Sequence, residues 1–113
     1  MLHDRDESRA NELIAILSGP YPKRIVRGAA DPTGFEVVVN ATPMGISPSD
    51  PLPVPAHLLS ASMFVGDVIA GHDVTPLLMA AREAGCKTAD GVAMVEAGIE
   101  LMQDFLLAQV DSE

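Results

Sequence analysis

The chain has 113 residues, which is enough for one compact domain with a single core. Hydrophobic residues make up 48% of it and charged residues 20%, so we expect a globular rather than a disordered protein. The formal charge of −9 argues against nucleic acid or an anionic membrane as a partner, because both repel an acidic surface.

The sequence indicates a soluble protein of a reducing compartment. Cys86 is the only cysteine, so no internal disulfide can form and the cytoplasm is the expected location. Charged residues follow Met1 almost at once, which is unlike a secretory signal peptide. No apolar run approaches the roughly 18 residues that a membrane span needs.

The first predicted element is a helix over residues 8–18, where apolar residues recur at helical spacing. Ser8 is the residue expected to cap its amino end. Residues 24–27 are predicted to form a short strand. Residues 36–40 form a run of β-branched residues, which is typical of a strand buried on both faces.

An irregular surface loop is predicted over residues 43–55, which contain five prolines. A second buried strand is expected over residues 62–69. Thr75 precedes a proline and is expected to cap a helix that ends at Gly85.

A brief strand at residues 86–89 and a final helix over residues 91–109 complete the expected elements. The apolar residues of this helix are predicted to lie on one face. Helices that alternate with continuous apolar strands indicate an α/β fold with a parallel sheet. In such sheets ligands bind beyond the carboxyl ends of the strands. The segments expected there are residues 4–6, 40–45 and 67–71.

Asp4 and Asp6 flank Arg5 in the first of these segments. An acidic residue that ends the second strand of a dinucleotide fold can bind the ribose 2′-hydroxyl of NAD, whereas an arginine can receive the 2′-phosphate of NADP. Two carboxylates repel a phosphate and therefore favour NAD. The alternative interpretation is a charged entry to the helix.

In the second segment, a strand that ends in Asn40, Ala41 and Thr42 offers backbone amides and short side chains to a nicotinamide ribose or a substrate. The alternative is a plain exit from the strand, with Gly45 in a turn.

No metal site is predicted. His72 and Asp73 are adjacent in an expected turn, and no third ligand has a suitable spacing.

Four motifs, in order, resemble the C-terminal half of the shikimate/quinate dehydrogenase family. The family reads roughly N-A-T-P-x-G, then D-x-x-Y-x-P-x-x-T-P-L-L, then D-G-x-x-M-x-x-x-Q. Here the corresponding segments are NATPMG, DV with TPLL, and DG-x2-M, preceded by DRDESRANEL. The resemblance implies a three-layer, Rossmann-like partial domain with a mostly parallel sheet.

The resemblance also implies a set of cofactor-binding residues. One group would surround the adenosine ribose, a second would line the cofactor cleft, and a third would lie near the nicotinamide. They are Asp4, Arg5, Asp6 and Arg9; Asn40, Ala41 and Thr42; and Val68 and Gly91. Because Asp4 and Asp6 replace the Asn and Thr of the NADP pattern, NAD is the expected cofactor, and Arg5 keeps NADP possible.

The sequence departs from the family at two substrate-contacting positions. Ala70 stands where the family usually has Tyr, and Gly98 stands where it has Gln. Both C-terminal substrate contacts are therefore missing, and the substrate-binding residues stay unassigned.

A Gly-rich phosphate turn is expected about 20 residues before the acidic residue, and Asp4 leaves no room for it. We therefore expect residues 1–113 to be the C-terminal portion of an NAD(P)-binding domain, without its first strand, its glycine turn or the family's N-terminal catalytic domain. No catalytic residue is assigned. Loss of a central strand exposes backbone and apolar surface, so the chain is expected to form a homo-oligomer or to exchange elements.

The favoured hypothesis is a fragment of an NAD(P)-dependent dehydrogenase that transfers hydride between nicotinamide and a cyclic hydroxy acid. The fragment is expected to have little or no activity alone. One alternative is a non-catalytic, self-associating binding or assembly module. Another is an unrelated small α/β domain of the response-regulator kind, which the lack of an acidic cluster after a first strand disfavours.

Overall fold

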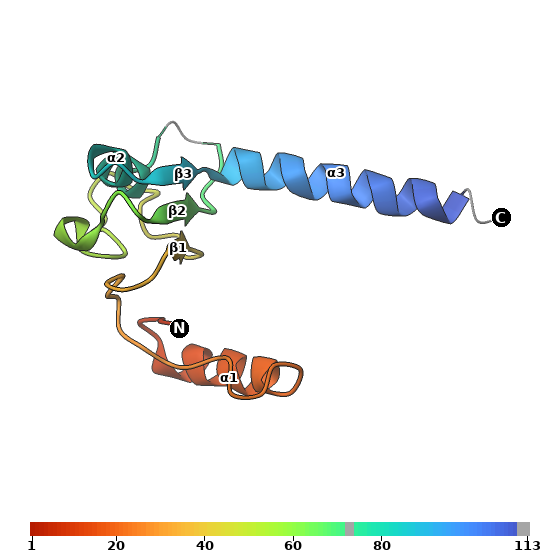
Figure 1. Ribbon diagram of the computed structural model, residues 1–113, viewed down its shortest axis with the longest axis horizontal. Helices are drawn as coiled ribbons and strands as arrows, with labels where there is room; N and C mark the ends of the chain where they lie inside the picture. The colour runs from red at the N-terminus through yellow and green to blue at the C-terminus, as the bar shows by residue number, and fades with distance from the viewer. Residues whose placement is uncertain (72–73, 111–113) are drawn as a thin grey trace. The chain divides into compact units, whose positions relative to one another are not determined.

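The computed structural model describes residues 1–71 and 74–110 (Figure 1). The chain divides into two compact units, residues 1–32 and residues 33–113, which are described separately below. The pair His72 and Asp73, for which no metal role was expected, lies outside the described residues. None of the helices in the described ranges combines the length and apolar character that crossing a bilayer requires.

The first unit is built around helix α1 (Glu7–Ser18). The prediction of Ser8 as its N-cap is wrong, because the cap is Asp6. One carboxylate oxygen of Asp6 accepts hydrogen bonds from the backbone amides of Ser8 at 3.0 Å and Arg9 at 3.2 Å. A carboxylate can satisfy two of the amides left open at a helix start, and it also interacts favourably with the helix dipole.

The strand predicted at residues 24–27 does not form. Instead, Leu2 and Arg27 make one isolated parallel bridge. The Leu2 amide donates to the Val26 carbonyl at 2.8 Å, and the Gly28 amide donates to the Leu2 carbonyl at 3.0 Å. A strand requires a ladder of successive pairs, and the described residues provide this segment with a single bridge.

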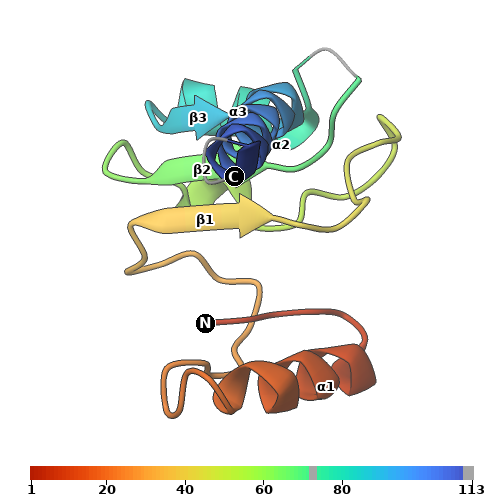
Figure 2. The same cartoon turned by 90° about the vertical axis from the view of Figure 1, so that its right-hand side faces the viewer.

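The second unit contains three parallel strands in the order β1 (Val37–Asn40), β2 (Phe64–Asp67) and β3 (Lys87–Ala89), which lie side by side in Figure 2. The predicted α/β fold with a parallel sheet is therefore confirmed. The strands are in register at their carboxyl ends, where Asn40 is paired with Asp67.

Helix α2 (Pro76–Glu83) covers one face of this sheet, and the core lies between the two. Thr75 caps α2 as predicted, since its hydroxyl accepts from the Leu78 amide at 3.4 Å. Gly85, with φ of 82°, follows the helix as predicted. The buried core residues are Leu59, Met63, Val65, Leu77, Leu78, Ala81 and Cys86. Leu59 directly follows the short helix η1 (Ala56–Leu58).

The other face of the sheet is open in the described part of this unit. Val37 and Val39 point to it and are 61% and 58% exposed, so the prediction that this strand is buried on both faces is wrong. Successive side chains in a strand alternate between faces. Only Val38 and Asn40 of β1 therefore share the face on which α2 packs.

Helix α3 (Gly91–Val110) begins directly after β3 and extends away from the three strands in Figure 1. Asp90 stabilises its first turn by accepting from the Ala93 amide at 2.9 Å. The predicted helix is confirmed, but the apolar face that it was expected to carry is exposed rather than buried.

Truncation of Leu78 should test whether the core between α2 and the sheet is the main source of the stability of the chain. Leu78→Ala removes a fully buried side chain and should lower the free energy of unfolding by about 2–5 kcal/mol. Met79→Ala is the matched control, because Met79 is the next residue and is 53% exposed. Chemical denaturation of both variants measures the difference, and equal midpoints would contradict this assignment of the core.

Candidate functional site

Two buried polar residues end neighbouring strands of the second unit. Asn40 ends β1 with 5% of its surface exposed, and Asp67 ends β2 with 3% exposed. They are partners in the parallel register, and the Asn40 amide nitrogen donates to the Asp67 carboxylate at 3.2 Å. A polar pair therefore stands at the carboxyl edge of the sheet, where α/β proteins bind their ligands.

Asp67 joins this edge of the sheet to helix α2. Its Oδ1 accepts from the Ile69 amide at 3.2 Å, and its Oδ2 accepts from the Thr75 hydroxyl at 2.8 Å. Thr75 is itself buried and caps α2. Among the described residues, every buried side-chain nitrogen or oxygen has a hydrogen-bond partner. The carboxylate is thus held by donors from three segments, which offset the cost of burying it.

Asn40 also fixes the loop that follows β1. Its Oδ1 accepts from the Thr42 hydroxyl at 2.7 Å and from the Thr42 amide at 3.1 Å. Its Nδ2 donates to the Met44 carbonyl at 3.0 Å in addition to Asp67. An amide side chain has two donor hydrogens and two acceptor lone pairs, and all four are used here. Asn40 therefore positions the loop, whereas Ala41 in the same loop is exposed.

Gly91 brings the start of α3 against the segment that follows β2. A Cβ atom at this position would lie 2.5 Å from the carbonyl atoms of Ile69 and the carbonyl oxygen of Val68. The Gly91 amide donates to the Ile69 carbonyl at 3.2 Å. Only glycine allows this approach. Val68 and Gly91, which the resemblance implied as neighbours of the nicotinamide, thus do lie together.

The two residues at substrate positions of the family have open surroundings. Ala70 is exposed beyond the end of β2. Gly98 is half-buried on α3, and a Cβ atom there would meet nothing within 4 Å. Neither position offers a polar side chain to a substrate.

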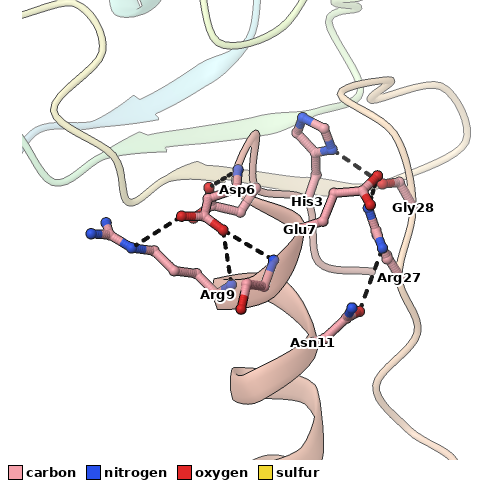
Figure 3. A network of polar contacts seen from close by, with 9 residues as sticks. His3, Asp6, Glu7, Arg9, Asn11, Arg27 and Gly28 are labelled. Atoms are coloured by element: carbon pink, nitrogen blue, oxygen red, sulfur yellow. Dashed lines mark hydrogen bonds and ion pairs between the residues drawn. The ribbon is translucent and has the colours of Figure 1, made fainter.

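The predicted ribose-binding residues lie in the first unit, at the start of α1, where Figure 3 shows Asp6 and Arg9. The Asp6 amide donates to the Asp4 carboxylate at 2.8 Å, and Arg9 Nε lies 3.5 Å from Asp6 Oδ2. Asp6 serves as the helix cap, so the alternative interpretation, a charged helix entry, describes that residue. Asp4 is half-buried, and Arg5 is exposed.

A second group of polar contacts ties the amino end of the first unit to residues 27–28 (Figure 3). Arg27 forms an ion pair with Glu7 at 2.6 Å and reaches Asn11 at 3.5 Å. The ring nitrogen Nδ1 of His3 lies 3.1 Å from the Gly28 carbonyl oxygen. These contacts hold the bridge between Leu2 and Arg27 in place, and sequence reasoning missed them because they join residues far apart in the chain.

In open α/β sheets ligands bind beyond the carboxyl ends of the strands, which is where Asn40, Asp67 and the segments that follow them lie. No protein-family model matches the chain. A quinate/shikimate dehydrogenase (NAD⁺) from Corynebacterium glutamicum strain R is 37% identical over 98 residues, which cover 80% of this chain and 34% of that protein. A shikimate dehydrogenase (NADP⁺) from Paracoccus denitrificans is 40% identical over 62 residues, covering 55% of this chain and 22% of that protein.

Solved structures agree with these sequence matches. Quinate dehydrogenase from Corynebacterium glutamicum in complex with NAD superposes with a TM-score of 0.69 at 35% identity, over 80% of this chain and 34% of that one. The ligand-free 5-ketofructose reductase of Gluconobacter sp. strain CHM43 gives 0.66 at 30% identity, over 80% and 35%. The chain is therefore related to the shikimate/quinate dehydrogenases, as its motifs predicted, and has their Rossmann-like fold. It spans about a third of the length of the curated relative that it matches over 98 residues.

The site contains two residues whose roles the sequence reasoning missed. Asp67 was placed only within the segment 67–71 expected beyond the carboxyl ends of the strands, and Thr75 only as a helix cap. The available signal was that Asn40 and Asp67 both fall in segments expected beyond the carboxyl ends of strands, because parallel neighbours bring such ends together. The bond from Thr75 to Asp67 depends on the path of the intervening chain and has no sequence signal of its own.

Removal of the Asp67 carboxylate should destabilise the second unit. Asp67→Ala leaves the Thr75 hydroxyl and the Ile69 amide without their acceptor in a buried position, which should cost about 1–3 kcal/mol of unfolding free energy. Asp104→Ala on exposed α3 is the control and should change stability by less than about 0.5 kcal/mol. Urea denaturation followed by circular dichroism compares them, and similar losses in both variants would contradict a structural role for the buried carboxylate.

Two glycines of α3 should respond oppositely to alanine. Gly91→Ala forces the Val68–Ile69 backbone to move and should cost about 1–3 kcal/mol. Gly98→Ala meets no atoms and should stabilise the helix by about 0.5–1 kcal/mol. Thermal unfolding gives the two signs, and amide NMR shifts of Val68 and Ile69 should change only in the first variant. A neutral Gly91→Ala would show that the close approach is not required.

Proposed function

We propose that this chain is the C-terminal portion of an NAD(P)-binding domain and that it binds the dinucleotide of a shikimate/quinate-type dehydrogenase. The observation that carries the proposal is the carboxyl edge of the second unit. There the Asn40 loop, Val68 and Gly91 follow neighbouring strands of a fold shared with an NAD-bound quinate dehydrogenase. The edge fits a flat, largely apolar ring, because Ala41 and Ala70 are small and exposed.

Each unit has its own share of the proposed contacts. In the second unit, Ala41, Thr42 and Val68 contact the cofactor, while the saturated side chain of Asn40 acts by holding their loop. In the first unit, Asp4 is the carboxylate assigned to the adenosine ribose, because Asp6 is the helix cap. Arg5 and Arg9 are exposed cations near it in sequence, and they keep NADP as the second choice.

The reaction assigned to the intact enzyme is hydride transfer between a cyclic hydroxy acid and the nicotinamide ring, which supplies the hydride-carrying carbon when it is bound. No residue among 1–113 is assigned a catalytic role, and residues 1–113 alone are proposed to bind cofactor with little or no turnover. With Ala70 and Gly98 at the substrate positions, the substrate differs from that of family members carrying Tyr and Gln there. We further propose that the protein is located in the cytoplasm and that copies of the chain associate with one another.

A calorimetric titration of the chain with NAD, and separately with NADP, tests this function. Saturable binding with NAD preferred is expected, since a carboxylate accepts a ribose hydroxyl and repels a phosphate. In a parallel NMR titration, the amides of Ala41, Thr42 and Val68 should shift with NAD. The absence of heat and of shifts up to millimolar concentration would refute the proposal for these 113 residues.

Asp4→Asn should reduce the preference for NAD. The loss of one charge-assisted hydrogen bond should weaken NAD binding about tenfold, or roughly 1.4 kcal/mol, while NADP binding stays the same or improves. Glu12→Gln removes a carboxylate from an exposed position of α1 and should leave both affinities unchanged. If the two variants behave alike, the preference reflects net charge rather than a contact by Asp4.

A further inference from the structure

Helix α3 carries the largest exposed apolar surface among the described residues. Its large apolar side chains are between 44% and 71% exposed. All but Leu107 lie within one broad arc of the helix: Val92, Met94, Val95, Ile99, Leu101, Met102, Phe105, Leu106 and Val110. Soluble proteins seldom leave an apolar surface of this extent in water, and one that is rimmed by polar residues marks an interaction site.

The spacing of these residues is that of a helix-pairing seam. Val92, Val95, Ile99, Met102 and Leu106 are separated alternately by three and four residues, which is the a and d pattern of a heptad repeat. A shallow apolar hollow on the helix surface is lined by two residues of this seam, Met102 and Leu106, and by Leu101 and Phe105. A hollow between side chains of one helix can receive a side chain from another.

Helix α3 needs packing partners to be stable. Helices in proteins draw most of their stability from a packed apolar face rather than from intrinsic propensity. The β-branched residues on α3, together with Gly98, weaken its intrinsic propensity further. Among the described residues of α3, only the first, Gly91, is buried. The remaining contacts must come from another surface.

We propose that two copies of this chain associate through α3, helix against helix, along Val92, Val95, Ile99, Met102 and Leu106. We call these five residues the α3 seam. The proposal does not rest on the proposed cofactor function. Ile99 and Met102 lie on either side of the helix midpoint, so they meet their counterparts whether the two helices run parallel or antiparallel.

The area of the surface suits a second copy. The nine apolar side chains of the arc expose roughly 800 Å² together, which is about what each partner contributes to a standard protein–protein interface. The α3 seam covers about half of this area, and the flanking side chains supply the rest of the contact.

The charges of α3 are compatible with self-pairing. Glu100 and Asp104 project from the side of α3 away from the seam, whereas Glu96 flanks the seam next to Val92, and no charged residue lies at a seam position. Only one acidic residue of α3, Glu96, therefore borders the contact between two copies, although the chain carries a net charge of −9. The same acidic face repels an anionic membrane, which is the other usual support for an exposed apolar helix.

Sedimentation equilibrium of the full chain tests the proposal. The wild-type chain should sediment as a dimer or larger at tens of micromolar, and Ile99→Glu/Met102→Glu should sediment as a monomer. Leu107→Glu is the matched control, because Leu107 is 63% exposed on the same helix but lies outside the seam. It should keep the wild-type mass. A monomeric wild type, or equal dissociation by both variants, would overturn the proposal.

Cross-linking avoids the risk that glutamates simply unfold α3. In Ile99→Cys a short bismaleimide should join two chains, whereas in Leu107→Cys it should not. Cys86 is buried and common to both, so the unmodified chain provides the blank. Cross-linking at residue 107 as efficient as at residue 99 would mean that contact between copies is random, and the assigned seam would be wrong.

Discussion

The hydrogen bond between Asn40 and Asp67 is the constraint on which the second unit depends. It joins the carboxyl ends of β1 and β2, and each partner then holds a different segment. Asn40 fixes the loop through Thr42 and Met44, and Asp67 fixes the start of α2 through Thr75. Because both residues are almost fully buried, each lost partner leaves a polar atom without water to replace it. The apolar core sets how α2 packs, but this polar group sets where the loops leave the sheet.

At the carboxyl edge of the sheet, the residues that fix the shape of the edge are therefore different from the residues that a ligand could contact. The most polar side chains of the edge, Asn40 and Asp67, are fully engaged with the protein. What the edge offers to a ligand is backbone and small side chains such as Ala41, held in fixed positions. Asp6 shows the same division in the first unit, since its carboxylate serves the start of α1 while Asp4 beside it accepts one backbone amide. Rigid support of this kind lowers the ordering cost of binding.

The sequence was most informative where a local rule acts alone. Thr75 with its proline and Gly85 after α2 follow capping rules, and β1 and β2 follow from apolar runs. Prediction failed where the outcome depends on distant partners. Residues 24–27 have the composition of a strand but find only Leu2 to pair with. Val37 and Val39 are β-branched residues typical of a strand buried on both faces, yet both are exposed. Their burial would require a second layer over the sheet, and the residue pattern within β1 does not show whether such a layer is present. The motifs predicted a cofactor site at the carboxyl edge of the sheet, which stays a prediction, whereas the bond from Thr75 to Asp67 required coordinates.

Helix α3 and the cofactor edge are mechanically connected through one glycine. The first turn of α3 is fixed by the Asp90 cap and by the contact of Gly91 with the Val68–Ile69 backbone. Beyond that turn, the described helix makes no comparable packing contact with its own unit. A change in the direction of the helix would therefore first affect the Val68–Ile69 backbone, and Val68 is a residue that we propose contacts the cofactor. In this fold, the α3 seam that we propose joins two copies begins at Val92, next to the Gly91 contact with the proposed ligand edge.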